Sequence, residues 1–243
     1  MSDLTPRELL AIYISRYLKN ETFGFAGTGS LVAVAACLMA QDLYSPDLSW
    51  VAGESGFINP SPPLVKSISG YNPRTEATKS MNAIIRFLSR GFDFFLAEVG
   101  QIDEKGRINR QFRPDGSCAP GTGSTSFLRK AKNVYLFSSK HSPDILTKKS
   151  LFISAWREKK DELQNTFLFT PEGLFKWISV KNVVKPQLVA IYNQSKKPEE
   201  IAEETGFEFK VANNLEVIKN PNDEEIYSLR EVVDTHGYLR EYW

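Results

Sequence analysis

Strand-like and helix-like segments alternate along the first half of the chain, and this alternation constrains the fold more than any other feature. Apolar strand patterns at 22–26 and 48–52 each end in a glycine-containing turn, and an Ala- and Leu-rich helical pattern lies between them at 30–43. A further helical pattern covers 75–90, and a strongly apolar strand pattern follows at 92–99. Alternation of this kind predicts an α/β fold with a largely parallel sheet covered by helices.

The second half of the chain also contains strand and helix patterns, together with a β-hairpin pattern. It contains two strand patterns, a β-hairpin pattern and two helical patterns, at 134–138, 187–192, 166–180, 198–205 and 221–233. A long polar stretch at 108–126 is rich in Gly, Ser, Pro and Thr, and loops of that length inside a domain are usually functional or disordered. No repeat and no linker composition interrupts the chain, which predicts a single domain over residues 1–243.

Composition and charge exclude several classes of protein. Thirty basic and twenty-nine acidic residues leave a net charge of +1, so the chain lacks the basic field of a nucleic-acid-binding protein. Cys37 and Cys118 are too few for a disulfide framework, and neither has metal-ligand spacing. The longest apolar run, Leu31–Ala40, is too short to span a membrane. Charged residues within Met1–Lys19 exclude a signal peptide, so a cytoplasmic protein is expected.

Three glycine-rich turns are the candidate sites for chemistry, namely 27–29, 53–56 and 121–123. Ligands of parallel sheets bind where loops converge at the carboxyl ends of the strands. Only the second turn contains an ionisable side chain, Glu54. A carboxylate at this point can attack a thioester carbonyl and form an acyl anhydride, while backbone N–H groups of neighbouring turns stabilise the oxyanion. Position alone does not separate this role from that of a solvated loop residue.

The other reactive or phosphate-binding candidates have less support. The turn at 27–29 lacks the third glycine of a dinucleotide fingerprint and the Gly-Lys-Ser/Thr ending of a P-loop. His141 and His236 lack partners at ligand spacing and are expected at the surface. Cys118 lies in the long polar stretch without a nearby histidine to activate it, and Cys37 is expected in the core of an apolar helix.

A set of short motifs, spread in consistent order over nearly the whole chain, resembles the family I CoA-transferases, in particular their β subunits of the glutaconate type. The motifs are Ala26-Gly27-Thr28-Gly29, Leu43-Tyr44-Ser45-Pro46-Asp47, Glu54-Ser55-Gly56, Gly100-Gln101-Ile102-Asp103 with Gly106 and Asn109, Gly121-Thr122-Gly123, Thr170-Pro171-Glu172-Gly173, Glu204-Thr205-Gly206-Phe207, and the last helix ending at Asp234. The elements Glu-Ser-Gly and Gly-Gln-Ile-Asp are the most specific of these.

The resemblance implies both a fold and an activity. The fold is an open three-layer α/β/α domain with a mainly parallel sheet, and the activity is CoA transfer between an acyl-CoA and a carboxylic acid. Glu54 occupies the position of the family's nucleophile. Coenzyme A is then a co-substrate rather than a tightly bound cofactor, and no metal is involved. An α subunit is the implied partner, with the active site between the two subunits.

The resemblance also implies roles for residues around Glu54. Those of the oxyanion and substrate loop are Val99, Gly100 and Gln101. Those that bind CoA or the acyl substrate are Gly27, Thr28, Gly29, Ser55, Gly56, Gly121, Gly123 and Ser124.

The sequence departs from the family pattern at two places, and these departures leave alternatives open. Glu98 and Val99 replace a glycine pair before Gln101, and a β-branched residue disfavours a positive φ. Thr122 interrupts a run of glycines. A CoA-thioester hydrolase or an acyl-CoA decarboxylase on the same fold is therefore the second hypothesis. A non-catalytic subunit that completes a partner's active site is the third, while retention of Glu54 favours transfer.

Overall fold

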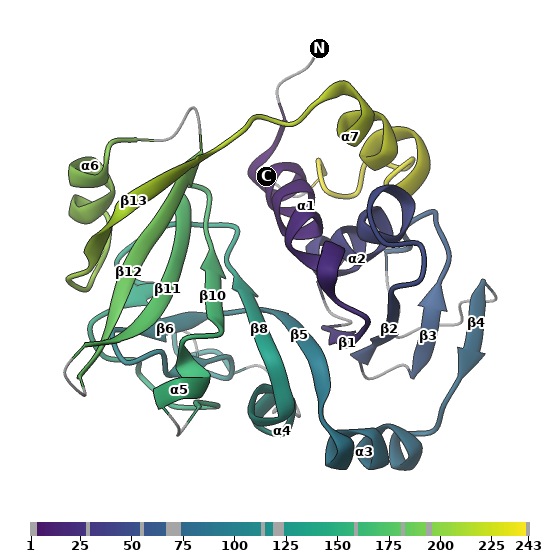
Figure 1. Cartoon of the computed structure of the whole chain (residues 1–243), viewed down its shortest axis with the longest axis horizontal. Coiled ribbons are helices and arrows are strands. Elements are labelled where there is room, and N and C mark those ends of the chain that lie inside the picture. Colours follow the sequence, from purple (N-terminus) through teal and green to yellow (C-terminus); the bar gives the residue numbers. More distant parts are fainter. Residues whose placement is uncertain are drawn as a thin grey trace. The chain divides into compact units, whose positions relative to one another are not determined.

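The structure is a computed structural model, and it describes residues 4–27, 30–53, 56–66, 74–112, 115–118, 124–157, 160–180, 183–192 and 196–241. The chain divides into two compact units, shown in Figure 1. Unit 1 comprises Met1–Ala97 and Pro221–Trp243, and unit 2 comprises Glu98–Asn220. The single domain expected over 1–243 stays a prediction.

Unit 1 contains a mixed sheet whose central strands are parallel. Its strands are β1 (Phe23–Ala26), β2 (Ser49–Ala52), β3 (Phe57–Pro60), β4 (Thr75–Thr78) and β5 (Phe92–Glu98). The order is β5-β1-β2-β3-β4, in which β5, β1 and β2 are parallel and β3 is antiparallel to both of its neighbours, β2 and β4. Ala26 pairs with both Ala52 and Leu96, so the three parallel strands end at one edge of the sheet.

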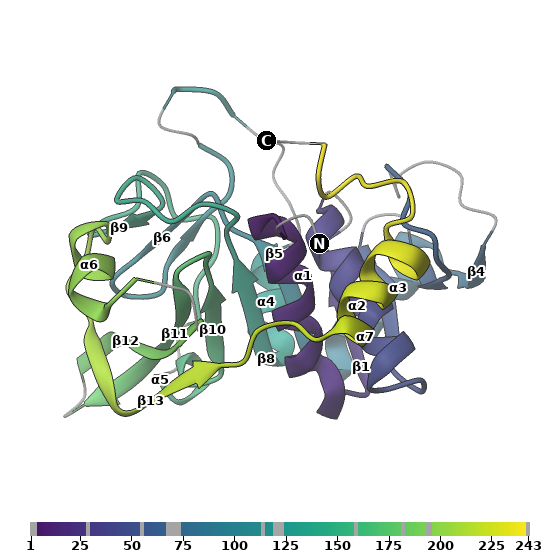
Figure 2. The ribbon, with the colours of Figure 1, turned by 90° about the horizontal axis from the view of Figure 1, so that it is seen from above.

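Helices of unit 1 pack on one another as well as on the sheet. They are α1 (Pro6–Tyr17), the short turn η1 (Leu18–Asn20), α2 (Leu31–Leu43), α3 (Met81–Arg90), α7 (Asp223–Tyr227) and the π-helical turn η3 (Ser228–Val233). Helix α2 is buried along most of its length and packs against α1 and η3. Figures 1 and 2 both show α7 beside α2, although more than 170 residues separate them in the sequence. The apolar run at 31–40 is therefore a core helix.

Partly buried ion pairs fix the C-terminal segment to the first helices. Glu225 accepts from Arg16 Nε at 2.6 Å and from the hydroxyl of Tyr44, and Arg230 Nε donates to Glu8 at 2.8 Å. Burial is the main cause of a raised pKa at Tyr44, so its hydroxyl stays protonated and donates. Tyr44 belongs to the Tyr-Ser-Pro-Asp motif, and its contact shows that this motif has a structural role in unit 1.

Unit 2 is built on a second mixed set of strands. They are β8 (Ala131–Phe137), β10 (Thr166–Phe169), β11 (Gly173–Val180), β12 (Val183–Tyr192) and β13 (Lys210–Ile218), adjacent in that order. The pairs β8–β10 and β12–β13 are parallel, whereas β10–β11 and β11–β12 are antiparallel. Figure 1 shows β10 to β13 side by side.

Short elements complete unit 2. A small sheet has the order β7 (Ile108–Asn109), β6 (Gln101–Asp103), β9 (Leu146–Thr147), and the helices are α4 (Ser124–Lys130), α5 (Lys160–Leu163) and α6 (Pro198–Glu203). The predicted α/β fold with parallel central strands is confirmed. No helix within the described ranges is both long enough and apolar enough to cross a membrane.

One predicted helix is wrong at its beginning. The pattern at 75–90 predicts a helix throughout, but Thr75–Thr78 forms strand β4 and only Met81–Arg90 is helical. Strand β4 pairs antiparallel with β3, and Thr75 Oγ1 donates to Ile58 O at 2.6 Å. Pairing across the sheet and the β-branched threonines therefore outweigh the helical periodicity at this point.

Candidate active site

Two glycines bracket the turn that contains Glu54, and both are described. Glu54 and Ser55 themselves lie outside the described residues. Gly56 N–H donates to Gly53 O at 3.4 Å, and Gly56 O accepts from Lys79 N–H at 2.9 Å. Gly56 has a φ of +70°, and a Cβ added there would lie 2.1 Å from Lys79 O. Only glycine fits this position, because it needs both a left-handed backbone and a close backbone contact.

The turn after β1 begins at the same edge of the sheet. Gly27 N–H donates to Leu96 O at 2.9 Å, and Gly27 O accepts from Ser30 N–H at 3.3 Å. Thr28 and Gly29 lie outside the described residues. Since Ala26 pairs with Ala52, the segment leading to Glu54 starts beside Gly27. Helix α2 also starts at this edge, so its N-terminal N–H groups and dipole favour negative charge there.

The loop predicted to stabilise the oxyanion begins with two amides that already have acceptors. Val99 N–H donates to Phe137 O at 2.9 Å, and Gly100 N–H donates to Asn109 O at 3.2 Å. Val99 is buried and has no positive φ, because Asn59 is the one non-glycine with a positive φ among the described residues. Its branched side chain is thus compatible with the backbone. An oxyanion role for these amides stays a prediction, and it requires each N–H to leave its present backbone acceptor and donate to the oxyanion.

The side chain of Gln101, the third residue of that loop, connects three segments of unit 2. Its Nε2 donates to Asp144 O at 2.9 Å, and its Oε1 accepts from Asn109 Nδ2 at 2.8 Å and from Leu151 N–H at 3.2 Å. Both Gln101 and Asn109 are buried. The amide of Gln101 therefore fixes the loop from the inside.

The aspartate that ends the Gly-Gln-Ile-Asp motif closes the next turn. Asp103 is fully buried and accepts from Arg107 Nε at 2.7 Å and from the N–H groups of Lys105 and Arg107 at 3.0 Å. Gly106 in the same turn has a φ of +73°. This part of the motif is explained by the folding of unit 2, without a ligand.

His141 joins two other motifs, and the expectation that it lies at the surface is wrong. Its Nδ1 is 2.9 Å from Thr170 Oγ1, and its Nε2 is 2.9 Å from Thr205 Oγ1. Thr205 Oγ1 donates to Ile201 O at 2.7 Å and Thr170 Oγ1 donates to Gly173 O at 3.1 Å, so the backbone fixes both threonine hydroxyls that contact the ring. Lys196 adds ion pairs to Glu204 and Glu172 of the same two motifs. In the sequence, the only feature that pointed to these contacts was the threonine present in each of the two motifs, Thr170 and Thr205.

Burial lowers the pKa of His141 to about 4, with Glu204 opposing the shift and Lys196 adding to it. The unfolded imidazole has a pKa of about 6.5, so between pH 6.5 and 4 the unfolded state binds more protons than the folded state. The contribution of His141 to stability should therefore be greatest above pH 6.5 and decrease towards pH 4. Because the ring is partly exposed, we expect the decrease to be about 1–3 kcal/mol.

The variant His141→Gln isolates this contribution to stability from the titration of carboxylates. The difference in unfolding free energy between the wild-type protein and His141→Gln should shrink as the pH falls from 7 to 4.5. Urea denaturation at both pH values measures it. A difference that is the same at both pH values would contradict the assignment of a neutral, partly buried His141.

The remaining candidates are placed only in part. Gly121 and Gly123 lie outside the described residues, and Ser124 is the first residue of α4. Cys118 is exposed, whereas Cys37 is buried in α2, as expected, and burial raises its pKa. Within the described ranges, no group of three or more His, Cys, Asp or Glu side chains is arranged to bind a metal ion.

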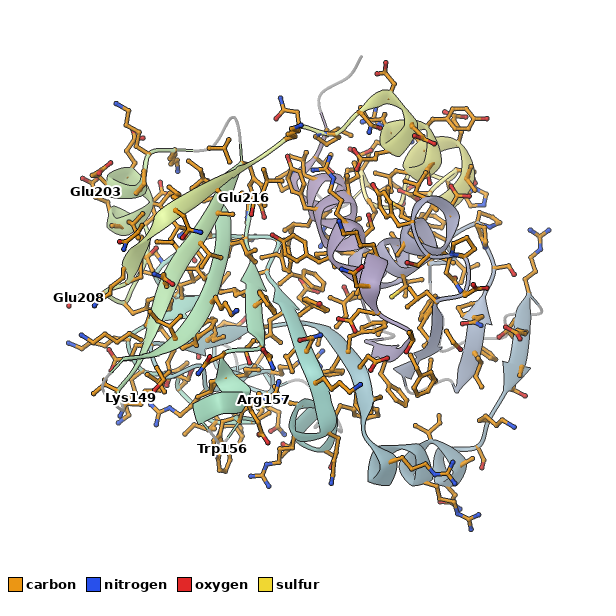
Figure 3. All side chains as sticks on the ribbon, viewed as in Figure 1. Lys149, Trp156, Arg157, Glu203, Glu208 and Glu216 are labelled. Atoms are coloured by element: carbon orange, nitrogen blue, oxygen red, sulfur yellow. The ribbon has the colours of Figure 1, made fainter. Side chains whose placement is uncertain are left out.

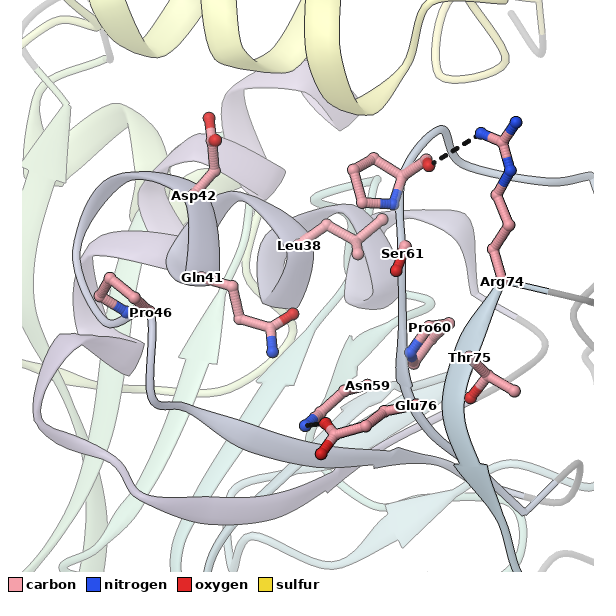
Figure 4. A pocket seen from close by; sticks show the side chains of 11 residues that line it. Leu38, Gln41, Asp42, Pro46, Asn59, Pro60, Ser61, Arg74, Thr75 and Glu76 are labelled. Atoms are coloured by element: carbon pink, nitrogen blue, oxygen red, sulfur yellow. Dashed lines mark hydrogen bonds between the residues drawn. The ribbon is translucent and has the colours of Figure 1, made fainter.

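A pocket of about 770 Å³ in unit 1 lies away from the Glu54 turn. It is lined by Leu38, Gln41, Asp42, Pro46, Asn59, Pro60, Ser61, Pro62, Arg74, Thr75 and Glu76. Figure 4 shows Gln41 facing Asn59 and Glu76, and Asn59 Nδ2 donates to Glu76 at 2.6 Å. Asn59 Oδ1 also accepts from Trp50 N–H at 2.8 Å, which places the pocket near the amino end of β2. Gly53 follows the opposite end of that strand.

Comparison with known proteins supports the fold. No protein-family model and no curated protein sequence matches the chain, but solved structures do. Glutaconate coenzyme A-transferase from Acidaminococcus fermentans matches with a TM-score of 0.84 and 18% identity, over 100% of this chain and 99% of that chain. The decarboxylase AibA/AibB matches with a TM-score of 0.83 and 22% identity, over 98% of both chains.

A third similar structure is IpdAB of Rhodococcus jostii RHA1, with a TM-score of 0.76 and 16% identity over 98% of both chains. At these identities, the similarity establishes the fold rather than a shared activity. The three-layer α/β/α architecture expected from the sequence motifs is confirmed. This chain has the fold of the CoA-transferases.

Proposed function

We propose that this chain is a CoA-transferase subunit that moves CoA between an acyl-CoA thioester and a carboxylic acid, with Glu54 as the nucleophile. The observation that carries the proposal is the Gly53–Gly56 turn at the carboxyl edge of the parallel strands, in a chain with a CoA-transferase fold. A carboxylate in this turn would lie at the edge where α/β sheets bind ligands.

The reaction proceeds through two covalent intermediates on Glu54. A carboxylate oxygen attacks the thioester carbonyl carbon, and the C–S bond then breaks. CoA leaves as a thiolate, and a glutamyl–acyl anhydride remains on the enzyme. The thiolate then attacks the glutamyl carbonyl carbon, and the acyl group leaves as a carboxylate. The glutamyl-CoA thioester passes CoA to the acceptor acid by the reverse steps.

Backbone groups of several loops are proposed to supply binding and charge stabilisation. The residues proposed to contact CoA or the acyl group are Gly27, Thr28, Gly29, Ser55, Gly56, Gly121, Gly123 and Ser124. Val99, Gly100 and Gln101 form the proposed oxyanion loop. The N-terminus of α2 adds a favourable potential for the carboxylate substrate at the edge where Gly27 lies.

Coenzyme A is a co-substrate in this proposal, and no tightly bound cofactor is needed. The partner is an α-type subunit that completes the active site, and the cytoplasm, where acyl-CoA esters are available, is the proposed location. The names of two similar structures, AibA/AibB and IpdAB, each denote two components, which supports a partner for this chain.

Product analysis tests the transfer reaction directly. The complex of this chain with its α-type partner is incubated with an acyl-CoA, with and without an acceptor carboxylate. We expect new acyl-CoA to form only when the acceptor is present, with ping-pong kinetics. Free CoA that accumulates at the same rate without acceptor would contradict transfer.

The second candidate is hydrolysis or decarboxylation of an acyl-CoA on the same fold. Two observations favour it: a decarboxylase is among the similar structures, and the first two amides of the proposed oxyanion loop already have acceptors. Release of CO2 in the same experiment would support it. In the third candidate, a non-catalytic subunit, the complex works normally when Glu54 is replaced.

A further inference from the structure

Unit 2 exposes a cluster of large apolar side chains, which we name the apolar patch. Its members and exposed fractions are Phe112 (42%), Leu151 (63%), Phe152 (41%), Ile153 (37%) and Trp156 (38%). The rings of Phe112 and Phe152 are 4.8 Å apart between centroids, so the two segments that form the patch are in contact. Figure 3 shows Trp156 at the outer edge of unit 2 in that view.

The backbone beneath the apolar patch is held by hydrogen bonds and is not a loose loop. Ser154 N–H donates to Ile108 O at 2.8 Å, and Ile108 N–H donates to Ala155 O at 2.9 Å. Thr125 Oγ1 donates to Ser154 O at 2.6 Å. The apolar side chains are thus presented on a fixed frame, which lowers the entropic cost of binding a partner.

The composition of the apolar patch is that of a protein interface. A folded chain seldom exposes several neighbouring large apolar side chains unless they bind something. Aromatic residues and arginine are enriched at the centres of interfaces and contribute most of their binding energy. Here Arg129 lies over the ring of Trp156, with its Cζ 5.1 Å from the centroid.

Charges next to the apolar patch indicate the kind of partner. Lys148 and Lys149 precede it and are exposed, Arg129 lies over Trp156, and the backbone N–H of Arg110 donates to Ser154 Oγ beside it. Acidic side chains nearby are Asp115 in the neighbouring segment and Glu162, whose carboxylate is 4.0 Å from Arg157 Nε. A second copy of this chain would bring the same basic side chains to the interface, which is unfavourable. The surface therefore suits a different chain with an apolar centre and acidic side chains around it.

We infer that the apolar patch is the docking surface for the α-type subunit. This inference rests on the proposed function, which requires such a subunit. Leu151 N–H donates to Gln101 Oε1 at 3.2 Å, so a chain that docks on the patch touches residues bonded directly to the proposed oxyanion loop. Docking would thereby complete the active site.

A binding experiment with matched variants tests the inference. The full chain is combined with the CoA-transferase α-type chain of the same genome, and the Kd is measured by biolayer interferometry. Phe152→Ser and Trp156→Ser should each raise the Kd by about tenfold or more, and Lys148→Glu with Lys149→Glu should raise it further at low salt. Tyr227→Ser, which changes an exposed ring on α7 of unit 1, is the control and should leave the Kd unchanged.

Hydrogen exchange of the wild-type complex keeps the test independent of how the variants fold. Binding of the α-type chain should slow exchange over 148–157. The inference is overturned if the complex forms equally well with Phe152→Ser and Trp156→Ser, or if 148–157 exchanges at the same rate when the partner is bound. It is also overturned if CoA alone protects this segment, or if the variants instead separate a homodimer. CoA transfer by the wild-type proteins is assayed separately. If the two chains bind through the patch but do not transfer CoA, the proposed function is wrong and the docking surface is not.

Discussion

Replacing Glu54 by Gln is expected to abolish CoA transfer, lowering kcat by about 10³-fold or more, because the amide cannot form the anhydride. Gln has nearly the shape of Glu, so the fold and the affinity for acyl-CoA should change little. Steady-state kinetics of the complex with its partner, together with the Kd for acyl-CoA, separate these effects. A loss of kcat at unchanged acyl-CoA affinity is the pattern expected of a nucleophile.

The control for this prediction is a second Glu→Gln change in the same unit. Glu231 is an exposed residue of η3, and Glu231→Gln should leave kcat within about twofold of the wild-type value. If Glu54→Gln retains full activity, the proposal of covalent catalysis is excluded. A subunit that merely completes a partner's active site would then explain the chain better.

Replacing Gly56 by Ala is expected to have the second largest effect, on both stability and transfer. A φ of +70° costs a residue with a Cβ about 1–2 kcal/mol, and the 2.1 Å approach to Lys79 O forces the backbone to move. Together these should lower the unfolding free energy by about 2–5 kcal/mol. Because the turn that contains Glu54 would shift, CoA transfer should fall by about 10²-fold. Urea denaturation and kinetics of the complex measure the two effects.

Gly116 provides a control that separates backbone strain from steric overlap. It has a φ of +81°, but a Cβ added there would meet none of the described atoms within 4 Å. Gly116→Ala should therefore cost only about 1–2 kcal/mol and leave transfer unchanged. If Gly56→Ala and Gly116→Ala destabilise the protein equally, the close contact with Lys79 has no energetic importance.

The parts of the fold that could be predicted are those in which local pattern and tertiary environment agree. Strands β1, β2 and β5 are short apolar runs that end in glycine or polar turns, and helix α2 has an unbroken Ala- and Leu-rich composition. Strand β13 could not be predicted, because most of its residues are exposed at a sheet edge and show no alternation. Its pairing with β12 decides its structure.

In the candidate site, too, the features that depend on local sequence could be predicted, and those that depend on distant contacts could not. Gly56 is predictable as a turn glycine, whereas the partners of His141 are 29 and 64 residues away in the sequence. The segment with Phe152 and Trp156 has the composition of a buried strand, yet its large apolar side chains are exposed. Sequence patterns do not distinguish an apolar core from an apolar interface, because burial by another chain leaves the same composition.

The most direct test of the account is to trap the intermediate on Glu54. The complex is incubated with acyl-CoA and then with borohydride, which reduces a glutamyl thioester to an alcohol, and the modified peptide is located by mass spectrometry. We predict an acyl-CoA-dependent modification at Glu54 that disappears when an excess of acceptor carboxylate has discharged the enzyme. Turnover by the wild-type complex without any modification of Glu54 would contradict the central claim.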